Sequence, residues 1–267
     1  MLERWRVQPG TNVDLEAVDP ASTPGAPGGK EATLAALPAL TVELADLQDR
    51  LAAEARRSLL VVLQAPDAGG KDGTIRHVFH GVNPQGTRVH SFKAPAGDER
   101  AHDFLWRVHR VVPAAGEIGI FNRSHYEDVL AVRVRKLVAP SVWRPRFELI
   151  GSFEALLAHE GTTIVKLYLH ISKEEQRERL QARLDDPDKR WKFRPEDLAD
   201  RVLWDRYRAA YNEAISRTAT SQAPWFIVPA DHKWYRNWAV STILVETLRK
   251  MDPRYPQPAE ALPKAVG

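Results

Sequence analysis

Cysteine does not occur anywhere in the 267 residues, and this absence excludes disulfide bonds, thiolate metal ligands and cysteine nucleophiles. No apolar run approaches the roughly 20 residues that a membrane span requires, and the N-terminus lacks the apolar segment of a signal peptide. Hydrophobic residues make up 43% and charged residues 27% of the chain, which disfavours a disordered or fibrous protein. We therefore expect a cytoplasmic globular protein without a membrane partner.

Acidic and basic side chains nearly balance, since the net charge is only +3. The pI near 9.1 nevertheless leaves room for a locally basic surface that attracts a polyanion. No nucleic-acid recognition motif is visible, so nucleic acid is not the expected polyanion.

Five short apolar runs rich in β-branched residues predict strands, and helical stretches lie between them. The predicted strands are Leu59–Leu63, Arg88–Phe92, Glu117–Phe121, Thr163–Leu169 and Trp225–Val228. The predicted helices are Gly73–His80, Asp98–Val111, His125–Val138, Phe147–His159, Lys173–Leu184, Glu196–Arg217 and His232–Lys250. Strands that alternate with helices favour an α/β fold in three layers, with a mostly parallel five-stranded sheet covered on both faces.

The N-terminal region is expected to lie outside this core. Residues Ser22–Gly29 predict a loop, and the segment before them predicts a surface arm. Leucines spaced by three or four residues from Glu31 onward predict an amphipathic helix, interrupted by Pro38, that packs on the domain. This interpretation divides the chain into an arm and helix over 1–57, a core domain over 58–255 and a tail over 256–267.

A phosphate-binding loop is predicted between the first strand and the following helix. Glycines there allow backbone N–H groups to face phosphate oxygens, and an exposed lysine supplies charge at the helix N-terminus. The residues concerned are Asp67, Ala68, Gly69, Gly70, Lys71, Asp72 and Gly73. Against the pattern G-x-x-x-x-G-K-[ST], Ala65 and Asp72 depart from the expected residue types, so an ordinary turn before a helix with an acidic first turn is the alternative.

The third predicted strand ends in a second group of polar residues. Ligands gather at the carboxyl ends of parallel strands, so Asn122 and Arg123 are expected beside the phosphate loop. Ser124 and Glu127 also have capping-box spacing, and Asp128 suits the positive end of a helix, so these residues are candidates for both a cap and a site.

Taken together, six blocks of the sequence resemble the polyphosphate kinase 2 family between about Leu59 and Leu248. The blocks are Asp67–Gly73, Ser91–Pro95, Phe104–Arg107, Phe121–Ser124, Asp186–Lys192 and Ala230–Tyr235. The resemblance implies a P-loop kinase core, an α-helical lid at about 183–200, dependence on Mg²⁺ with Mn²⁺ as a possible substitute, and reversible phosphoryl transfer between inorganic polyphosphate and the adenine nucleotides AMP, ADP and ATP. It also implies a homo-oligomer, either a dimer or a tetramer.

The resemblance further indicates a subgroup. Many family members carry Asp-Arg-Ser after the third strand, whereas this chain has Asn122, Arg123 and Ser124, followed by Glu127 where many relatives have Asn. This combination is similar to class III, whose members accept both nucleoside monophosphates and diphosphates.

The resemblance also suggests a role for each candidate residue. Lys71 and the loop amides would hold phosphates, Arg123 would neutralise the transferring group, and Arg183 would act from a lid that excludes water. Asp67 with Asn122 or Glu127 would bind magnesium. Further phosphate-binding candidates are Lys189, Lys192 and Lys233, and candidates for a polyphosphate channel are Lys93, Arg107, Arg133 and Arg135.

Two alternatives remain open at this point. Asp67 lies four residues before Lys71, as in thymidylate-kinase-like enzymes, so a nucleotide kinase with ATP as donor is the first alternative. The second is a protein that binds a polyanion or nucleic acid without catalysis, through its basic residues and tryptophans. Turnover of any nucleotide would exclude the second, and formation of ATP from ADP and polyphosphate would exclude the first.

Overall fold

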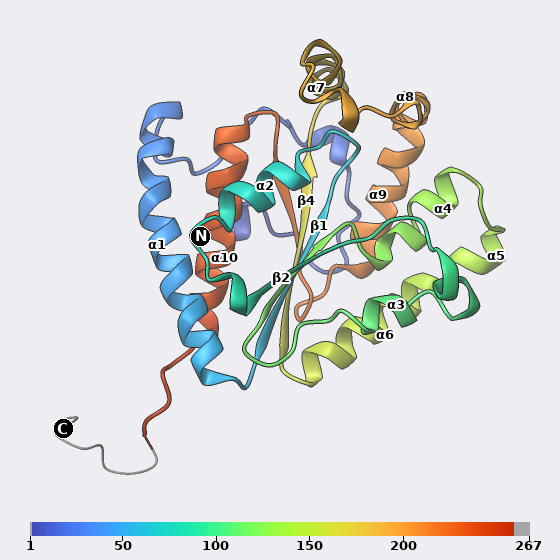
Figure 1. Cartoon of the computed structure of the whole chain (residues 1–267). Helices are drawn as coiled ribbons and strands as arrows, with labels where there is room; N and C mark the ends of the chain where they lie inside the picture. Colours follow the sequence, from blue (N-terminus) through green and yellow to red (C-terminus); the bar gives the residue numbers. More distant parts are fainter. Residues whose placement is uncertain (1, 259–267) are drawn as a thin grey trace.

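A computed structural model describes residues 2–258 of the chain, and Figure 1 shows its arrangement. The strands are β1 (Ser58–Gln64), β2 (Thr87–Ser91), β3 (Ile118–Asn122), β4 (Thr162–His170) and β5 (Trp225–Pro229). The α-helices are α1 (Lys30–Glu54), α2 (Lys71–Val78), α3 (Trp106–His109), α4 (Ala131–Val134), α5 (Pro140–Trp143), α6 (Arg146–His159), α7 (Lys173–Asp185), α8 (Pro195–Val202), α9 (Trp204–Thr218) and α10 (Lys233–Met251). The 3₁₀ helices are η1 (Leu2–Arg4), η2 (Leu15–Ala17), η3 (Pro84–Gly86), η4 (Gly97–Ala101), η5 (His125–Asp128) and η6 (Arg190–Lys192).

The strands form one parallel sheet in the order β2-β3-β1-β4-β5. The central strand β1 is buried along its whole length, so its alternate side chains enter two different cores. Leu59, Val61 and Leu63 pack with α1, α2 and α10 on one face. Leu60 and Val62 pack on the other face with residues of α6 and α9. The three layers are visible in Figure 1, with α1 and α10 on one side of the sheet and α6 and α9 on the other.

All five predicted strands are confirmed, each within one residue at either end. The register pairs Leu63 with Asn122, so the polar segments after β1 and β3 leave the sheet side by side. This parallel alignment brings two candidate segments of the sequence together at one edge of the sheet.

Three of the predicted helices are wrong, because each is interrupted in the structure. Asp98–Val111 contains only η4 and α3, because the Asp103 carboxylate accepts hydrogen bonds from the amides of Leu105 and Trp106 and forms a turn instead of a helix. His125–Val138 divides into η5 and α4. Glu196–Arg217 divides into α8 and α9 at Leu203, whose ψ of 14° departs from helical geometry.

The N-terminal segment is not a surface arm. Leu2, Trp5, Val7, Val13 and Leu15 are buried. The backbone of this segment runs beside β5, where Val7 N donates to Trp225 O at 2.9 Å and Ile227 N donates to Trp5 O at 2.8 Å. The segment therefore protects an edge of the sheet that would otherwise be open.

The structure tests the predicted N-terminal helix but only part of the predicted C-terminal tail. The helix after the Ser22–Gly29 loop is confirmed as α1, and Pro38 lies inside it. Of the predicted C-terminal tail, residues 259–267 lie outside the described residues.

Local sequence features define the starts of α7 and α8 but not that of α10. Ser172 Oγ accepts from Glu175 N at 3.0 Å at the start of α7, and Pro195 is the first residue of α8. Asp231 does not cap α10, because its carboxylate instead accepts from Ser172 N at 2.8 Å. That contact joins the carboxyl end of β5 to the start of α7.

Candidate active site

The loop between β1 and α2 has the backbone geometry of an anion cradle. Ala68 and Gly70 have φ values of 59° and 98°, both in the left-handed region, and successive residues of this kind turn amides toward one point. Gly69 has no room for a side chain, since a Cβ there would lie 2.5 Å from Ala65 Cβ. No side chain caps α2 at Gly70, so the first-turn amides of that helix remain available to a bound anion.

Lys71 is buried, contrary to the expectation of an exposed loop lysine. Only 9% of its surface is exposed, and Nζ donates to the carbonyl oxygens of Ala65 at 2.8 Å and Pro66 at 3.3 Å. The side chain thus folds back along its own loop. Burial, assisted by the charge of Arg123, lowers the pKa of Lys71 to about 8.

Arg123 and Asp67 form an ion pair across the cradle, with 2.7 Å between Arg123 Nη2 and Asp67 Oδ1. The backbone of Arg123 is in the left-handed region, with φ at 63°, and its amide donates to Leu63 O at 3.1 Å. A non-glycine residue in this conformation needs support from its surroundings and is frequent at functional sites. Burial acts to raise the pKa of Asp67, but the charges of Lys71 and Arg123 outweigh it and lower that pKa.

Asn122 links the ends of β3 and the phosphate loop. Its Nδ2 donates to Asp72 Oδ1 at 2.7 Å, while its side-chain Oδ1 accepts no hydrogen bond from the described residues. Asp72 therefore stands beside Asn122, at the position where the general phosphate-loop pattern has a hydroxyl residue.

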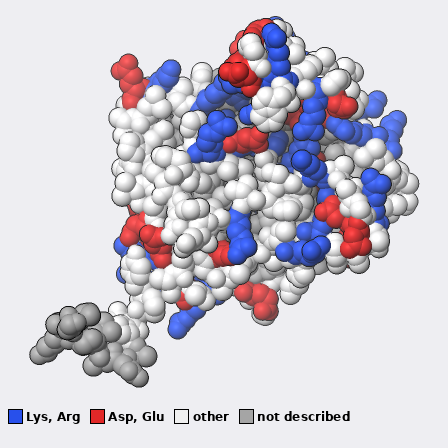
Figure 2. All heavy atoms as spheres, viewed as in Figure 1, with Lys and Arg blue, Asp and Glu red and all other residues white. Residues whose placement is uncertain are grey.

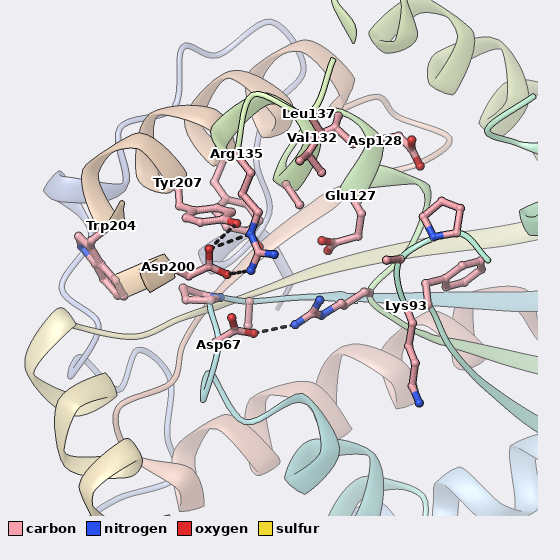
Figure 3. A pocket seen from close by; sticks show the side chains of 18 of the residues that line it. Asp67, Lys93, Glu127, Asp128, Val132, Arg135, Leu137, Asp200, Trp204 and Tyr207 are labelled. Atoms are coloured by element: carbon pink, nitrogen blue, oxygen red, sulfur yellow. Dashed lines mark hydrogen bonds and ion pairs between the residues drawn. The ribbon is translucent and has the colours of Figure 1, made fainter. Parts of the chain in front are cut away.

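Glu127 faces the site, and the capping-box alternative does not form. Ser124 Oγ accepts from Tyr126 N at 3.1 Å instead of from Glu127 N. When the side-chain amide of Gln64 is oriented so that both its nitrogen and its oxygen are hydrogen-bonded, Nε2 donates to Glu127 Oε1 at 3.1 Å and Oε1 accepts from Ser124 Oγ. Figure 3 shows the carboxylates of Asp67, Glu127 and Asp200 around the same open space.

The carboxylate of Asp128 contacts two arginine side chains, Arg146 and Arg107. It accepts from Arg146 Nη1 at 2.9 Å and lies 3.8 Å from Arg107 Nη2. Burial raises the pKa of Asp128 although both arginines oppose that rise. Arg107 in turn donates to Lys93 O at 2.7 Å, so Asp128 helps to fix the segment after β2.

A cleft of about 140 Å³ opens above the carboxyl ends of β1 and β3 (Figure 3). Phe92, Pro95, Val132 and Leu137 give it an apolar wall. The charged groups along it include Asp67, Lys93, Arg107, Arg123, Glu127, Arg135 and Asp200. An apolar wall beside a few convergent charges suits a ligand with a planar apolar part and an anionic part.

Three of the four predicted channel residues, Lys93, Arg107 and Arg135, line this cleft. Arg133 does not, because it pairs with Glu213 at 2.6 Å and lies over the ring of Trp143. Arg135 is held in place by Asp200, which accepts from both its Nε and Nη2, and Tyr207 Oη donates to the same carboxylate at 3.2 Å.

The predicted lid comprises the end of α7, η6 and α8. Arg183 lies 3.4 Å from Asp197 Oδ2, so the two helices are joined by an ion pair. α8 buries Asp197 and Asp200 toward the site while Leu198 and Val202 remain exposed. Lys189 pairs with Asp186 and Lys192 lies over Trp191, whereas Lys233 is exposed at the start of α10; none of these three lines the cleft.

Sequence reasoning missed several residues of the site. Asp197, Asp200 and Tyr207 lie in a predicted helix and carry no motif of their own. Arg179 and Arg236 lie in two other predicted helices, and the structure places both against the phosphate loop. Arg236 follows directly after the Ala230–Tyr235 block, so the block itself was the available signal. Figure 2, which has the same view as Figure 1, shows that Lys and Arg side chains gather in the upper half of the visible face, below and beside α7 and α8.

The oxygen donors around Lys71 fit a magnesium ion. Asp67, Glu127 and Asp72 lie near enough to oppose, through their charge, the effect of burial on the pKa of Lys71. Within residues 2–258 no three His, Cys, Asp or Glu side chains form a preformed metal cage. Magnesium often uses only one or two carboxylates and completes its shell with water and substrate phosphates, so residues of this kind could hold it.

Comparison with known proteins places the chain among polyphosphate-dependent phosphotransferases. The family model described as polyphosphate kinase 2 matches residues 29–256. An AMP/ADP-polyphosphate phosphotransferase of Meiothermus ruber is 58% identical over 265 residues, which cover 99% of both chains. An ADP-polyphosphate phosphotransferase of Rhodopseudomonas palustris is 45% identical and covers 84% of this chain and 81% of its own.

A solved structure agrees with these matches. The crystal structure of polyphosphate kinase 2 from Arthrobacter aurescens TC1 superposes with a TM-score of 0.94 at 45% sequence identity. The match covers 97% of this chain and 93% of the other. In the part of the chain that the structure describes, no helix is long and apolar enough to cross a membrane.

Proposed function

The chain belongs to the polyphosphate kinase 2 family, and we propose that it transfers the terminal phosphate of inorganic polyphosphate to ADP and AMP, forming ATP and ADP. The observation that carries the proposal is the Asp67–Arg123 pair beside Lys71 at the carboxyl ends of β1 and β3. Lys71 and Arg123 bring two positive charges to the point where phosphates would meet, and Asp67 holds Arg123 in place.

We propose that the acceptor nucleotide occupies the cleft of Figure 3. Phe92, Val132 and Leu137 would contact the base, and Arg107 and Arg135 would contact phosphates. The cleft leads to Lys71 and Arg123, so a terminal phosphate oxygen of the nucleotide would point toward the donor.

Catalysis then consists of alignment and charge neutralisation. The attacking phosphate oxygen of the acceptor is already ionised near pH 7, so no side chain needs to remove a proton. Lys71 would exchange its contacts with Ala65 O and Pro66 O for phosphate oxygens, and Arg123 would shield the transferring group. Arg183 would leave Asp197 as the lid closes and water is excluded.

We propose Mg²⁺ as the cofactor, with Mn²⁺ as a substitute. Asp67 and Glu127 would hold the ion directly or through water, together with the side-chain Oδ1 of Asn122. When bound, the ion neutralises phosphate charge. The Asp67–Arg123 and Asn122–Asp72 contacts would orient the residues that hold it.

Acceptance of AMP depends in this proposal on Glu127. AMP is shorter than ADP by one phosphate, so its terminal oxygen must be brought closer to the donor. Glu127 lies in the cleft and is released from capping, so its charge is available to hold magnesium or its waters. The Meiothermus ruber relative, whose name includes both acceptors, supports this part of the proposal.

We also propose that the protein forms a homo-oligomer, a dimer or a tetramer. α8 supports this, because it exposes Leu198 and Val202, with 83% of Val202 accessible, and buries two aspartates. An outward apolar face of this kind is typical of surfaces that another subunit covers. Light scattering coupled to size-exclusion chromatography tests the proposal, and a monomer at micromolar concentration would contradict it.

The proposed reaction is tested by incubating the enzyme with ADP, polyphosphate and Mg²⁺ in the absence of ATP. We expect ATP to accumulate without an equal amount of AMP. An enzyme that disproportionates two ADP molecules would form AMP and ATP in equal amounts and independently of polyphosphate. That result, or the absence of ATP, would contradict the proposal. Replacing ADP by AMP should yield ADP first and ATP later.

A further inference from the structure

Arg236 is a buried arginine without an ion-pair partner among the described residues. It lies on α10 with 2% of its surface exposed. Its Nε and Nη2 both donate to Asn237 Oδ1, at 3.2 and 2.8 Å, and Nη1 has no hydrogen-bond partner within residues 2–258. Burying a charge without a partner costs free energy, so a buried arginine of this kind calls for an explanation.

The free end of Arg236 points at the phosphate loop. A Cβ built on Gly70 would lie 2.1 Å from Arg236 Nη1 and 3.3 Å from Arg179 Nη1. Gly70 is the N-cap of α2, its φ is 98°, and no side chain satisfies the amides of that helix start. Two guanidinium groups therefore meet at the positive end of a helix.

Arg179 is held rigidly in this arrangement. Its Nε pairs with Glu175 at 2.6 Å, its Nη1 donates to Ala68 O at 3.2 Å, and its Nη2 donates to Ala230 O at 2.6 Å. These contacts connect α7, the phosphate loop and the end of β5. A donor fixed in this way keeps its position before any ligand arrives.

Positive charge is in excess at this point of the molecule. Glu175 is the carboxylate paired with Arg179, and Arg236 adds a second positive charge without a second carboxylate. Burial, together with repulsion from Arg179, lowers the pKa of Arg236 to about 10. The folded protein thus maintains an unfavourable charge that an anion would compensate.

We propose that Arg236 and Arg179 form a subsite, at the N-terminal end of α2, for a phosphate group of inorganic polyphosphate that is not itself transferred. The assignment rests on the proposed function for its donor. Neither arginine lines the cleft assigned to the acceptor, so the subsite is separate from the proposed nucleotide site. Its chemistry is that of a phosphate oxyanion bound by two guanidinium groups and backbone amides.

The experiment compares the wild type with Arg236→Met and a matched control, Arg249→Met. Arg249 lies on the same helix, is exposed, and pairs with Glu43 and Glu246 away from the phosphate loop. Binding of inorganic tripolyphosphate and of ADP is measured by calorimetry without turnover. For Arg236→Met we expect tripolyphosphate to bind at least about tenfold more weakly, since a charge-assisted hydrogen bond is lost, and ADP affinity to change less than twofold. Arg249→Met should bind both ligands as the wild type does.

Thermal melting separates a binding role from a structural role. Without anion, Arg236→Met should melt at or above the wild-type temperature, because an uncompensated buried charge is removed. With tripolyphosphate, the wild type should gain more in melting temperature than the variant. Equal tripolyphosphate affinity in the wild type and Arg236→Met, an equal loss for both ligands, or a lower melting temperature without anion would overturn the subsite.

The assay distinguishes failure of the subsite from failure of the proposed function. If tripolyphosphate binding depends on Arg236 but no ATP forms from polyphosphate and ADP, the subsite stands and the reaction is wrong. If Arg236→Met does not fold, Arg236→Lys keeps the charge but loses the planar fork, and the same weakening of tripolyphosphate binding is expected. Unchanged tripolyphosphate binding in Arg236→Lys would then overturn the proposal.

Discussion

Replacing Lys71 by Met should stabilise the protein while it removes activity. Lys71 is 9% exposed and has a pKa of about 8 in place of its ordinary 10.5. A shift of this size corresponds to about 3 kcal/mol at neutral pH, because each pKa unit is worth about 1.4 kcal/mol. The variant also loses two hydrogen bonds to carbonyl oxygens, and each loss reduces this stabilisation by about 1 kcal/mol.

The net stabilisation of Lys71→Met should thus be about 1 kcal/mol, or roughly 2–4 °C in melting temperature for a chain of this size. Turnover with ADP and polyphosphate should fall by about three powers of ten, since the lost charge offsets phosphate charge in the transition state. Calorimetric melting and an ATP-formation assay measure both quantities. Lys250→Met, a change at an exposed position in the last turn of α10, is the control and should affect neither.

The same lysine predicts a pH dependence of stability. Between pH 8 and 10.5 the unfolded chain binds more protons at Lys71 than the folded chain does, so this group makes the free energy of unfolding rise with pH in that window. Lys71→Met should lack this contribution. A variant that melts below the wild type, retains its turnover, or keeps the same rise with pH would refute the reasoning from burial.

Three further substitutions test the remaining roles. Asp67→Asn should raise the Mg²⁺ concentration needed for half-maximal rate by about tenfold or more, because a carboxylate ligand and the partner of Arg123 are both lost; an unchanged magnesium titration would contradict the ligand role. Glu127→Gln keeps the length of the side chain, so kcat/KM for AMP should fall about tenfold more than that for ADP; equal losses would show that Glu127 does not distinguish the acceptors. Arg183→Ala should lower kcat by about three powers of ten, because lid closure would bring its charge to the reacting phosphates beside Arg123, whereas Asp197→Asn, which removes only its resting partner, should leave kcat within a fewfold; a loss confined to KM in Arg183→Ala would indicate simple polyphosphate binding.

The sheet could be predicted from the sequence because its strands are continuous apolar runs. A strand buried on both faces needs no surrounding context to be recognised, and β1 is such a strand. Parallel strands align their carboxyl ends, so the proximity of the phosphate loop and Arg123 could be inferred from chain order.

Other features depend on contacts between distant segments and were therefore missed. Lys71 is buried only because its side chain folds onto Ala65 O and Pro66 O, which a motif does not reveal. Trp5 and Val7 are isolated apolar residues in the sequence, and their burial follows from the edge of β5. Arg179 and Arg236 meet because α7 and α10 converge on Gly70, so neither residue is distinctive within its own helix.

The origin of the transferred phosphate is the most direct test of the central claim. Polyphosphate labelled with ³²P is incubated with unlabelled ADP, Mg²⁺ and the enzyme, and the nucleotides are separated. We expect the label to appear in ATP, at its terminal phosphate, and Lys71→Met to form almost no labelled ATP. Label found only in inorganic phosphate, or ATP formed without label, would contradict direct transfer from polyphosphate to the nucleotide.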